Sequence, residues 1–187
     1  MNQPLNTWKE KWTHQPILML ITVIIWSIFI GLCIQAGTLI FTFTYSLIQP
    51  IISKDLYEGL NLFSLQTQSK WQYITLVSLL ISISILKAQL FYTMIRIFIK
   101  IDLVHPFSKG IAILISKLSY IAFTLGVTQF LSGRFVKTLD TEVFQLMGVD
   151  NHLSSSFEYF LISALIFAIA QVFKHGVEIQ AENELTV

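Results

Sequence analysis

Long stretches without a charged residue constrain this chain more than any other feature. No Asp, Glu, Lys or Arg occurs from Trp12 to Ser53, nor from Trp71 to Leu86. Apolar runs of about 18 or more uncharged residues are typical of helices that cross a lipid bilayer. Only 12% of the 187 residues are charged, which is about half the charged share of a soluble domain. The chain is therefore expected to be an integral membrane protein.

Four segments have the length and polarity of a membrane span, at about residues 17–38, 73–95, 111–131 and 157–173. Strands without partners are excluded in lipid, so each segment is predicted to be a helix. Ser108 is a predicted N-cap of the third helix, and Gly176 is expected to cap or bend the end of the fourth. We predict an all-α fold, a single membrane domain over residues 1–187 with four transmembrane helices in an up-and-down bundle and a tail at residues 176–187.

Basic residues predict the orientation of the bundle, because cytoplasmic connections carry an excess of Lys and Arg. The N-terminal tail, the second connection and the end of the fourth span hold six basic residues: Lys9, Lys11, Arg96, Lys100, Lys109 and Lys174. The other two connections hold four: Lys54, Lys70, Arg134 and Lys137. Both termini are therefore expected in the cytoplasm, with residues 49–70 and 132–156 on the outer side.

Each span carries one glutamine, and these are Gln35, Gln89, Gln129 and Gln171. Small and polar residues hold membrane helices together, so the glutamines are predicted to form interhelical hydrogen bonds, each contributing about 0.6–2 kcal/mol. On the fourth span, Gln171 belongs to a predicted contact stripe with Ala164, Ala168 and His175. A polar path for a transported compound is the alternative interpretation.

Two lysines, Lys87 and Lys117, lie inside the apolar zone. A lysine in the middle of a membrane costs about 2.5–3.5 kcal/mol, so it prompts a functional hypothesis. The antiparallel spans would place both lysines at nearly the same depth. One hypothesis is a shared anion site, with Arg96 nearby, for a lipid phosphate or a carboxylate of the tail. In the alternative, each lysine extends separately to the membrane surface.

The residues that usually carry catalysis are not arranged for it. The four histidines are not spaced as metal pairs, and no HExxH, CxxC, GxSxG or phosphate-binding glycine loop occurs. We therefore expect no enzyme activity, no metal and no cofactor. The lack of Asp or Glu within the spans argues against coupled transport of protons or cations. Without a basic run, direct binding to nucleic acid is not expected either.

Two segments, "HPFSKG" and "VFKHGVEIQAENELTV", resemble the hallmark segments of a bacterial membrane family, domain of unknown function 2975 (DUF2975). The matching positions are Pro106, Phe107, Phe173, Lys174, Gly176, Glu178, Glu182, Asn183, Glu184, Leu185, Thr186 and Val187. His105 replaces the common asparagine of the first segment. The resemblance implies four spans in a bacterial inner membrane, but no particular activity. Genes of this family often neighbour a small helix-turn-helix regulator, which suggests a regulatory partnership.

The acidic tail gives the leading functional hypothesis. If the helix restarts after Gly176, Glu178 and Glu182 share a face to which Leu185 belongs, with Glu184 beside it. We interpret the chain as a membrane-embedded regulatory or sensing protein whose tail contacts a cytosolic transcription regulator. Alternatives are a small transport or immunity protein acting on a hydrophobic or peptide compound, and a structural or lipid-binding subunit. A tail that is only a solvated end of the fourth helix is a further possibility.

Overall fold

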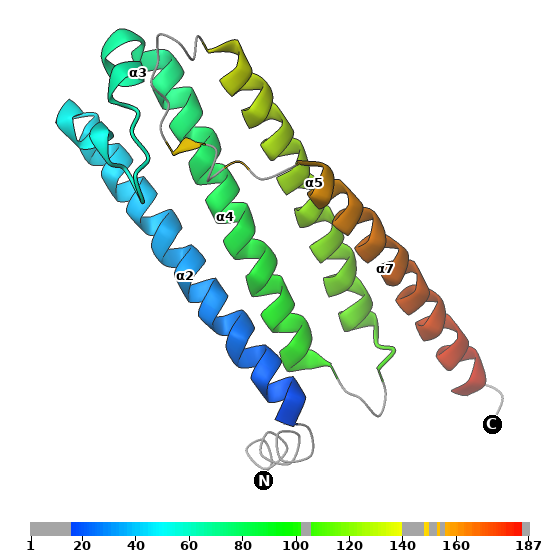
Figure 1. Ribbon diagram of the computed structural model, residues 1–187. Coiled ribbons are helices and arrows are strands. Elements are labelled where there is room, and N and C mark those ends of the chain that lie inside the picture. Colours follow the sequence, from blue (N-terminus) through cyan, green and yellow to red (C-terminus); the bar gives the residue numbers. More distant parts are fainter. Residues whose placement is uncertain (1–15, 102–105, 140–147, 150–152, 154–155, 185–187) are drawn as a thin grey trace.

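Four long helices make up most of the protein, as Figure 1 shows for the computed structural model. The structure describes residues 16–101, 106–139, 148–149, 153 and 156–184. The long helices are α2 (Pro16–Ser46), α4 (Lys70–Lys100), α5 (Lys109–Thr138) and α7 (Ser156–Glu184). Each is long and apolar enough to cross a membrane. The predicted all-α fold with four membrane helices is confirmed.

The helices pack in the order of the chain, with α2 on α4, α4 on α5 and α5 on α7 (Figure 1). Both described ends of the chain lie at the same end of the arrangement, which we name the terminal end. We name the opposite end, where α2 ends and α4 begins, the cap end. Among the described residues α2 and α7 share no extended interface, so these two helices form the edges of the arrangement.

The helices extend further than the predicted spans: α2 continues through a largely apolar stretch to Ser46, and α7 continues through polar residues to Glu184. Ser108 caps α5 as predicted, and its Oγ accepts a hydrogen bond from the Ile111 N–H at 3.3 Å. The prediction that Gly176 caps the end of the fourth helix is wrong. Helix α7 continues without a break through Gly176 to Glu184, and Gly176 is not among the residues with a positive φ.

The connection between α2 and α4 folds into a compact cap through a 3₁₀ helix, η1 (Pro50–Lys54), and a short helix, α3 (Phe63–Gln68). The side chains that fill this cap are fully buried leucines: Leu56, Leu60, Leu62 and Leu65. Polar contacts join α2 to α4 beside this cap, and the cap to α2. The hydroxyls of Ser46 and Tyr73 lie 2.5 Å apart, and Gln66 Nε2 donates to the Ser46 carbonyl at 2.7 Å. The apolar core therefore continues from the helices into this connection.

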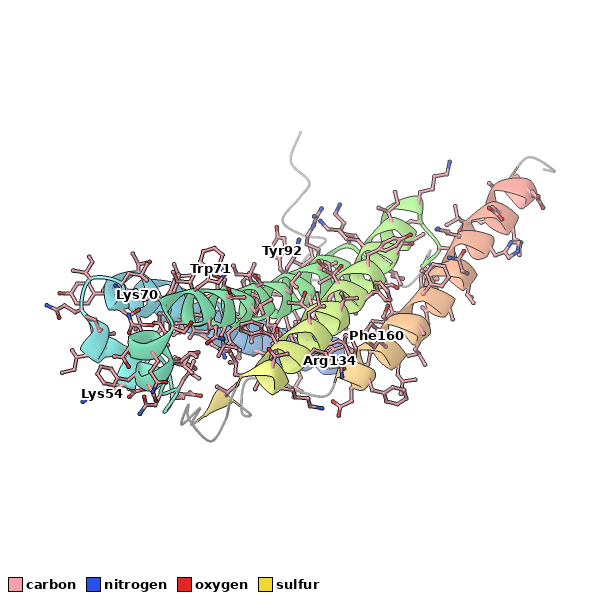
Figure 2. The ribbon with its side chains drawn as sticks, turned by 90° about the horizontal axis from the view of Figure 1, so that it is seen from above. Lys54, Lys70, Trp71, Tyr92, Arg134 and Phe160 are labelled. Carbon is pink, nitrogen blue, oxygen red and sulfur yellow. The ribbon has the colours of Figure 1, made fainter. Side chains whose placement is uncertain are left out.

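Small residues bring α5 and α7 close together. Ser119 Oγ donates to the Ser163 carbonyl at 3.0 Å, and Ser163 Oγ donates to the Ser119 carbonyl at 3.1 Å. A Cβ atom at Gly126 would lie 3.1 Å from two ring carbons of Phe160, which Figure 2 shows between these two helices. The absence of a side chain at Gly126 thus leaves room for the phenylalanine ring.

The contact stripe predicted for the fourth span lies on the wrong side of α7. Its members, Ala164, Ala168, Gln171 and His175, are all exposed. The buried side of α7 instead carries Ser163 and Ala170, with half-buried Phe160 beside them. Small residues of α5 accept a large ring from α7, so the contact does not require small residues on both helices.

Candidate functional site at the projecting end of α7

Helix α7 extends beyond the other helices at the terminal end (Figure 1). The register follows from the reciprocal bonds of Ser119 and Ser163. Because α5 and α7 are antiparallel, Phe173 is level with Lys109, the first residue of α5. The helix then runs on from Lys174 to Glu184, which at about 1.5 Å per residue carries it about 16 Å further. We name Lys174–Glu184 the projecting segment.

A phenylalanine from the connection between α4 and α5 holds the base of the projecting segment. The rings of Phe107 and Phe173 pack at 5.4 Å between centroids with 56° between their planes. A Cβ atom at Gly176 would lie 2.7 and 2.8 Å from two carbons of the Phe107 ring. Such distances are too short for non-bonded carbon atoms. Only a glycine at position 176 leaves space for this ring, so the two hallmark segments meet in the fold.

Beneath this contact lies a small apolar cluster that joins three helices. Its buried members are Ile111, Ile115 and Ala170, with Ile97, Ile101, Ile166 and Phe173 packed around them. The cluster takes residues from the end of α4, the start of α5 and the middle of α7. The direction in which α7 leaves the other helices is therefore set by packing at this level.

The projecting segment presents an exposed surface with two carboxylates. Glu178 and Glu182 are both exposed, and four residues of separation place them on one side of the helix. His175 Nδ1 lies 3.0 Å from Glu178 Oε2, with side chains 82% and 67% exposed, so this pair adds little stability. The side chain of Glu184 and the whole of Leu185, both predicted partner contacts, lie outside the described residues.

The three basic residues predicted to form an anion site lie on two helices, and the two on α4 lie on opposite sides of it. Lys87 is half-buried and follows the buried residues Ile83 and Ser84 by about one turn. Arg96, also half-buried, is nine residues further, which is about 180° around the helix. Lys117 is exposed on α5. Within the described part of the chain, none of the three forms an ion pair.

The glutamines do not form the interhelical bonds predicted for them in the described structure. Gln129 is 2% exposed, yet neither its Oε1 nor its Nε2 has a hydrogen-bond partner. Gln35 is half-buried, whereas Gln89 and Gln171 are exposed. Bonds between the long helices come instead from Ser119 with Ser163 and from Ser46 with Tyr73. Ser119 is a small buried residue of α5, but nothing in the sequence identifies Ser163 as its partner.

The comparison with known families matches the part of the chain that forms this site. A family model described as "Protein of unknown function (DUF2975)" matches residues 56–187. No curated protein and no solved structure is significantly similar to the chain. The matched range includes both Phe107 and Gly176, and it extends through the projecting segment.

Proposed function

Since the chain belongs to the DUF2975 family, we propose that it is a membrane-embedded regulatory protein that presents the projecting segment to a soluble partner protein. The observation that carries the proposal is the contact of Phe107 with Gly176 and Phe173 at the base of this segment. Beyond that contact, the helix exposes two carboxylates on one side. The excess of basic residues at the terminal end supports a cytoplasmic position for the segment.

A helix whose base is fixed by packing is a better docking element than a tail without such contacts. Glycine in the middle of a helix costs about 0.8–1.0 kcal/mol relative to alanine, and at Gly176 this cost allows Phe107 to pack against the helix. A segment ordered before binding loses less entropy when a partner binds. Glu178 and Glu182 favour a partner with a basic surface. A cytosolic helix-turn-helix regulator, the kind of protein suggested by the family's gene neighbourhoods, has such a surface.

The transport alternative has less support from the structure. That hypothesis assigns a polar path to residues such as Gln89 and Gln171. Both side chains are exposed on the outside of their helices, so they do not line a passage between the helices of one chain. A structural or lipid-binding role would account for the contact of Phe107 with Gly176 only as helix packing.

A mild-detergent pull-down from the native host, analysed by mass spectrometry, tests the regulatory proposal. The bait proteins are the full chain, a double variant Glu178→Gln/Glu182→Gln, and Glu158→Gln as a matched control. Glu158 is an exposed glutamate in the first turn of the same helix at its other end. Glutamine keeps the helix propensity of glutamate, so only the charge is lost.

We expect a soluble DNA-binding protein with the unchanged chain and with the control, and its loss with the double variant. Point variants are preferable to truncation after His175, because truncation also removes the glycine that contacts Phe107. Recovery of the same proteins with all three baits would refute docking through the carboxylates. Equal elution volumes of the three baits in detergent would show that the membrane fold is unchanged.

A further inference from the structure

Two polar side chains of neighbouring helices lack a partner among the described residues. Lys87 of α4 is half-buried and forms no ion pair. Gln129 of α5 is 2% exposed, and neither of its amide atoms is bonded. The middle of α4 falls at Ile85, so Lys87 lies about 3 Å from it along the axis. Unpaired polar groups inside a membrane are costly, and the cost indicates a function.

The packing of α4 on α5 places these two side chains on either side of one group of core residues. Ile83 of α4 belongs to the same buried cluster as Leu125 of α5, and we name the side of both helices that carries this cluster the interior side. Lys87 follows Ile83 by about one turn towards the terminal end, and Gln129 follows Leu125 by about one turn towards the cap end. Helical side chains tilt towards the N-terminus of their own helix. Because α4 and α5 are antiparallel, Lys87 and Gln129 tilt towards one another.

The helices that surround Lys87, namely α2, α4 and α5, supply no counter-charge for it. No Asp or Glu occurs in residues 59–101 or 103–139, and α2 has none. Water is also out of reach for this lysine. Arg96, near the terminal end, lies about 13 Å further along the helix, and the Lys87 side chain tilts away from that end. The anion that would pair with Lys87 must therefore come from outside these helices.

A long-chain carboxylic acid has the chemistry that this position requires. Its protonated headgroup is neutral and can enter the hydrocarbon, whereas a phosphate stays charged at neutral pH. The acid then binds as the carboxylate, with the proton held by the Lys87 ammonium. A buried ion pair is stable only when further hydrogen bonds satisfy its remaining lone pairs. Gln129 can supply one, because its Nε2 donates to carboxylate oxygens.

We propose that Lys87 and Gln129 bind the carboxylate of a long-chain carboxylic acid on the interior side of α4 and α5. The ligand enters from the lipid. Helices α2 and α7 lie at opposite edges and share no extended interface in the described part of the chain (Figure 1), so no fourth helix closes this side. The site uses no part of the projecting segment, and its test is therefore independent of the regulatory function proposed above.

Photolabelling of the purified full chain in phosphatidylcholine vesicles tests the site. The probe is a long-chain fatty acid with a diazirine next to its carboxyl group, and peptide mass spectrometry locates the label. We expect label on α4 near Lys87 and on α5 near Gln129, with oleic acid as a competitor. Methyl oleate, which lacks the acid, and phosphatidylglycerol, which offers a phosphate, should compete at least about ten times less well, because hydrogen bonds to a charged group carry such a difference.

Three results would overturn the proposal. Label spread evenly over the lipid-facing residues of α2 and α7 would show contact with the surrounding lipid only. Equal competition by methyl oleate would remove the role of the charge. Equal competition by phosphatidylglycerol would show that the site accepts any lipid anion and is not selective for a carboxylic acid.

Variants of the two polar residues test which side chains hold the carboxylate. Lys87→Met keeps a long side chain without the charge and should weaken the binding of oleic acid at least about tenfold. Gln129→Leu should weaken it by about 2- to 12-fold, the range of one hydrogen bond. The matched controls Lys117→Met and Gln89→Leu remove exposed side chains of α5 and α4 and should leave it unchanged.

The stability of the variants keeps this test decisive. Gln129→Leu removes a buried amide without a partner, so the ligand-free variant should be more stable than the unchanged chain, and weaker binding would not reflect unfolding. Unchanged binding in Lys87→Met, or equal losses in Lys87→Met and Lys117→Met, would refute the site.

Discussion

Replacement of Gly176 by alanine separates the helix propensity of this residue from its contact with Phe107. In an ordinary helix interior, alanine is about 0.8–1.0 kcal/mol more favourable than glycine. At Gly176 the new methyl group would occupy the position of the Phe107 ring. The ring is 38% exposed and can turn away into solvent, so the variant should still fold.

The expected magnitude follows from these two opposing effects. Displacing the Phe107 ring loses its pairing with Phe173, which is typically worth about 0.5–1.5 kcal/mol. This loss offsets the gain of about 0.8–1.0 kcal/mol in propensity, so Gly176→Ala should leave the free energy of unfolding nearly unchanged. Gly133 in α5 is the matched control, because a Cβ atom there meets nothing within 4 Å. Gly133→Ala should therefore show the full gain of propensity.

The assay is unfolding in mixed micelles by titration with a denaturing detergent, followed by circular dichroism. A double-mutant cycle with Phe107→Ala isolates the contact. In the Phe107→Ala background, Gly176→Ala should recover the stabilisation of about 1 kcal/mol seen at Gly133. If Gly176→Ala stabilises the chain as much as Gly133→Ala while Phe107 is intact, the ring does not depend on this glycine. The base of the projecting segment would then lack the support inferred for it.

The same unfolding titration tests three further predictions. Gln129→Leu should raise stability by about 1–3 kcal/mol, because both amide atoms are buried without a partner; a lower stability would reveal a bound water or another partner. Ser163→Ala should lower stability by about 0.6 kcal/mol through loss of its bond to the Ser119 carbonyl, and no change would show that the bond is not formed in the membrane. Gly148→Ala should lower stability by more than about 1 kcal/mol, since φ is +83° and the Cβ atom would lie 2.8 Å from the Gly59 carbonyl oxygen. The loss at Gly148 should exceed that for Gly59→Ala, where φ is +80° but the space is open; equal losses would indicate that the two glycines do not pack together.

The number and type of the long elements could be predicted from the sequence. An uncharged apolar run in lipid must satisfy its backbone within itself, and a helix does so without reference to any other part of the chain. The N-cap at Ser108 was predictable for the same reason, since the bond joins groups three residues apart. The end of α7 was not predictable in this way. Glycine often ends a helix, but it can also lie inside one when packing favours it.

The faces along which the helices meet were decided by the tertiary structure. Without a hydrophobic drive between helices in lipid, close packing and a few hydrogen bonds select the contact. The sequence offered glutamines and serines alike, and the structure joins Ser119 with Ser163 while it leaves Gln89 and Gln171 exposed. Composition sets how many helices lie in the membrane, but each helix can turn about its axis without changing that composition.

In the candidate site, too, some features follow from the sequence alone and others only from the tertiary structure. The sequence by itself determined the acidic end of the chain and its resemblance to a family, because those are properties of consecutive residues. Only the tertiary structure brought Phe107 onto Gly176 and joined two separate segments into one support. The physical reason is that a ring and a glycine distant in the chain meet only after α5 and α7 have packed in register, and that register depends on the shapes of both helices.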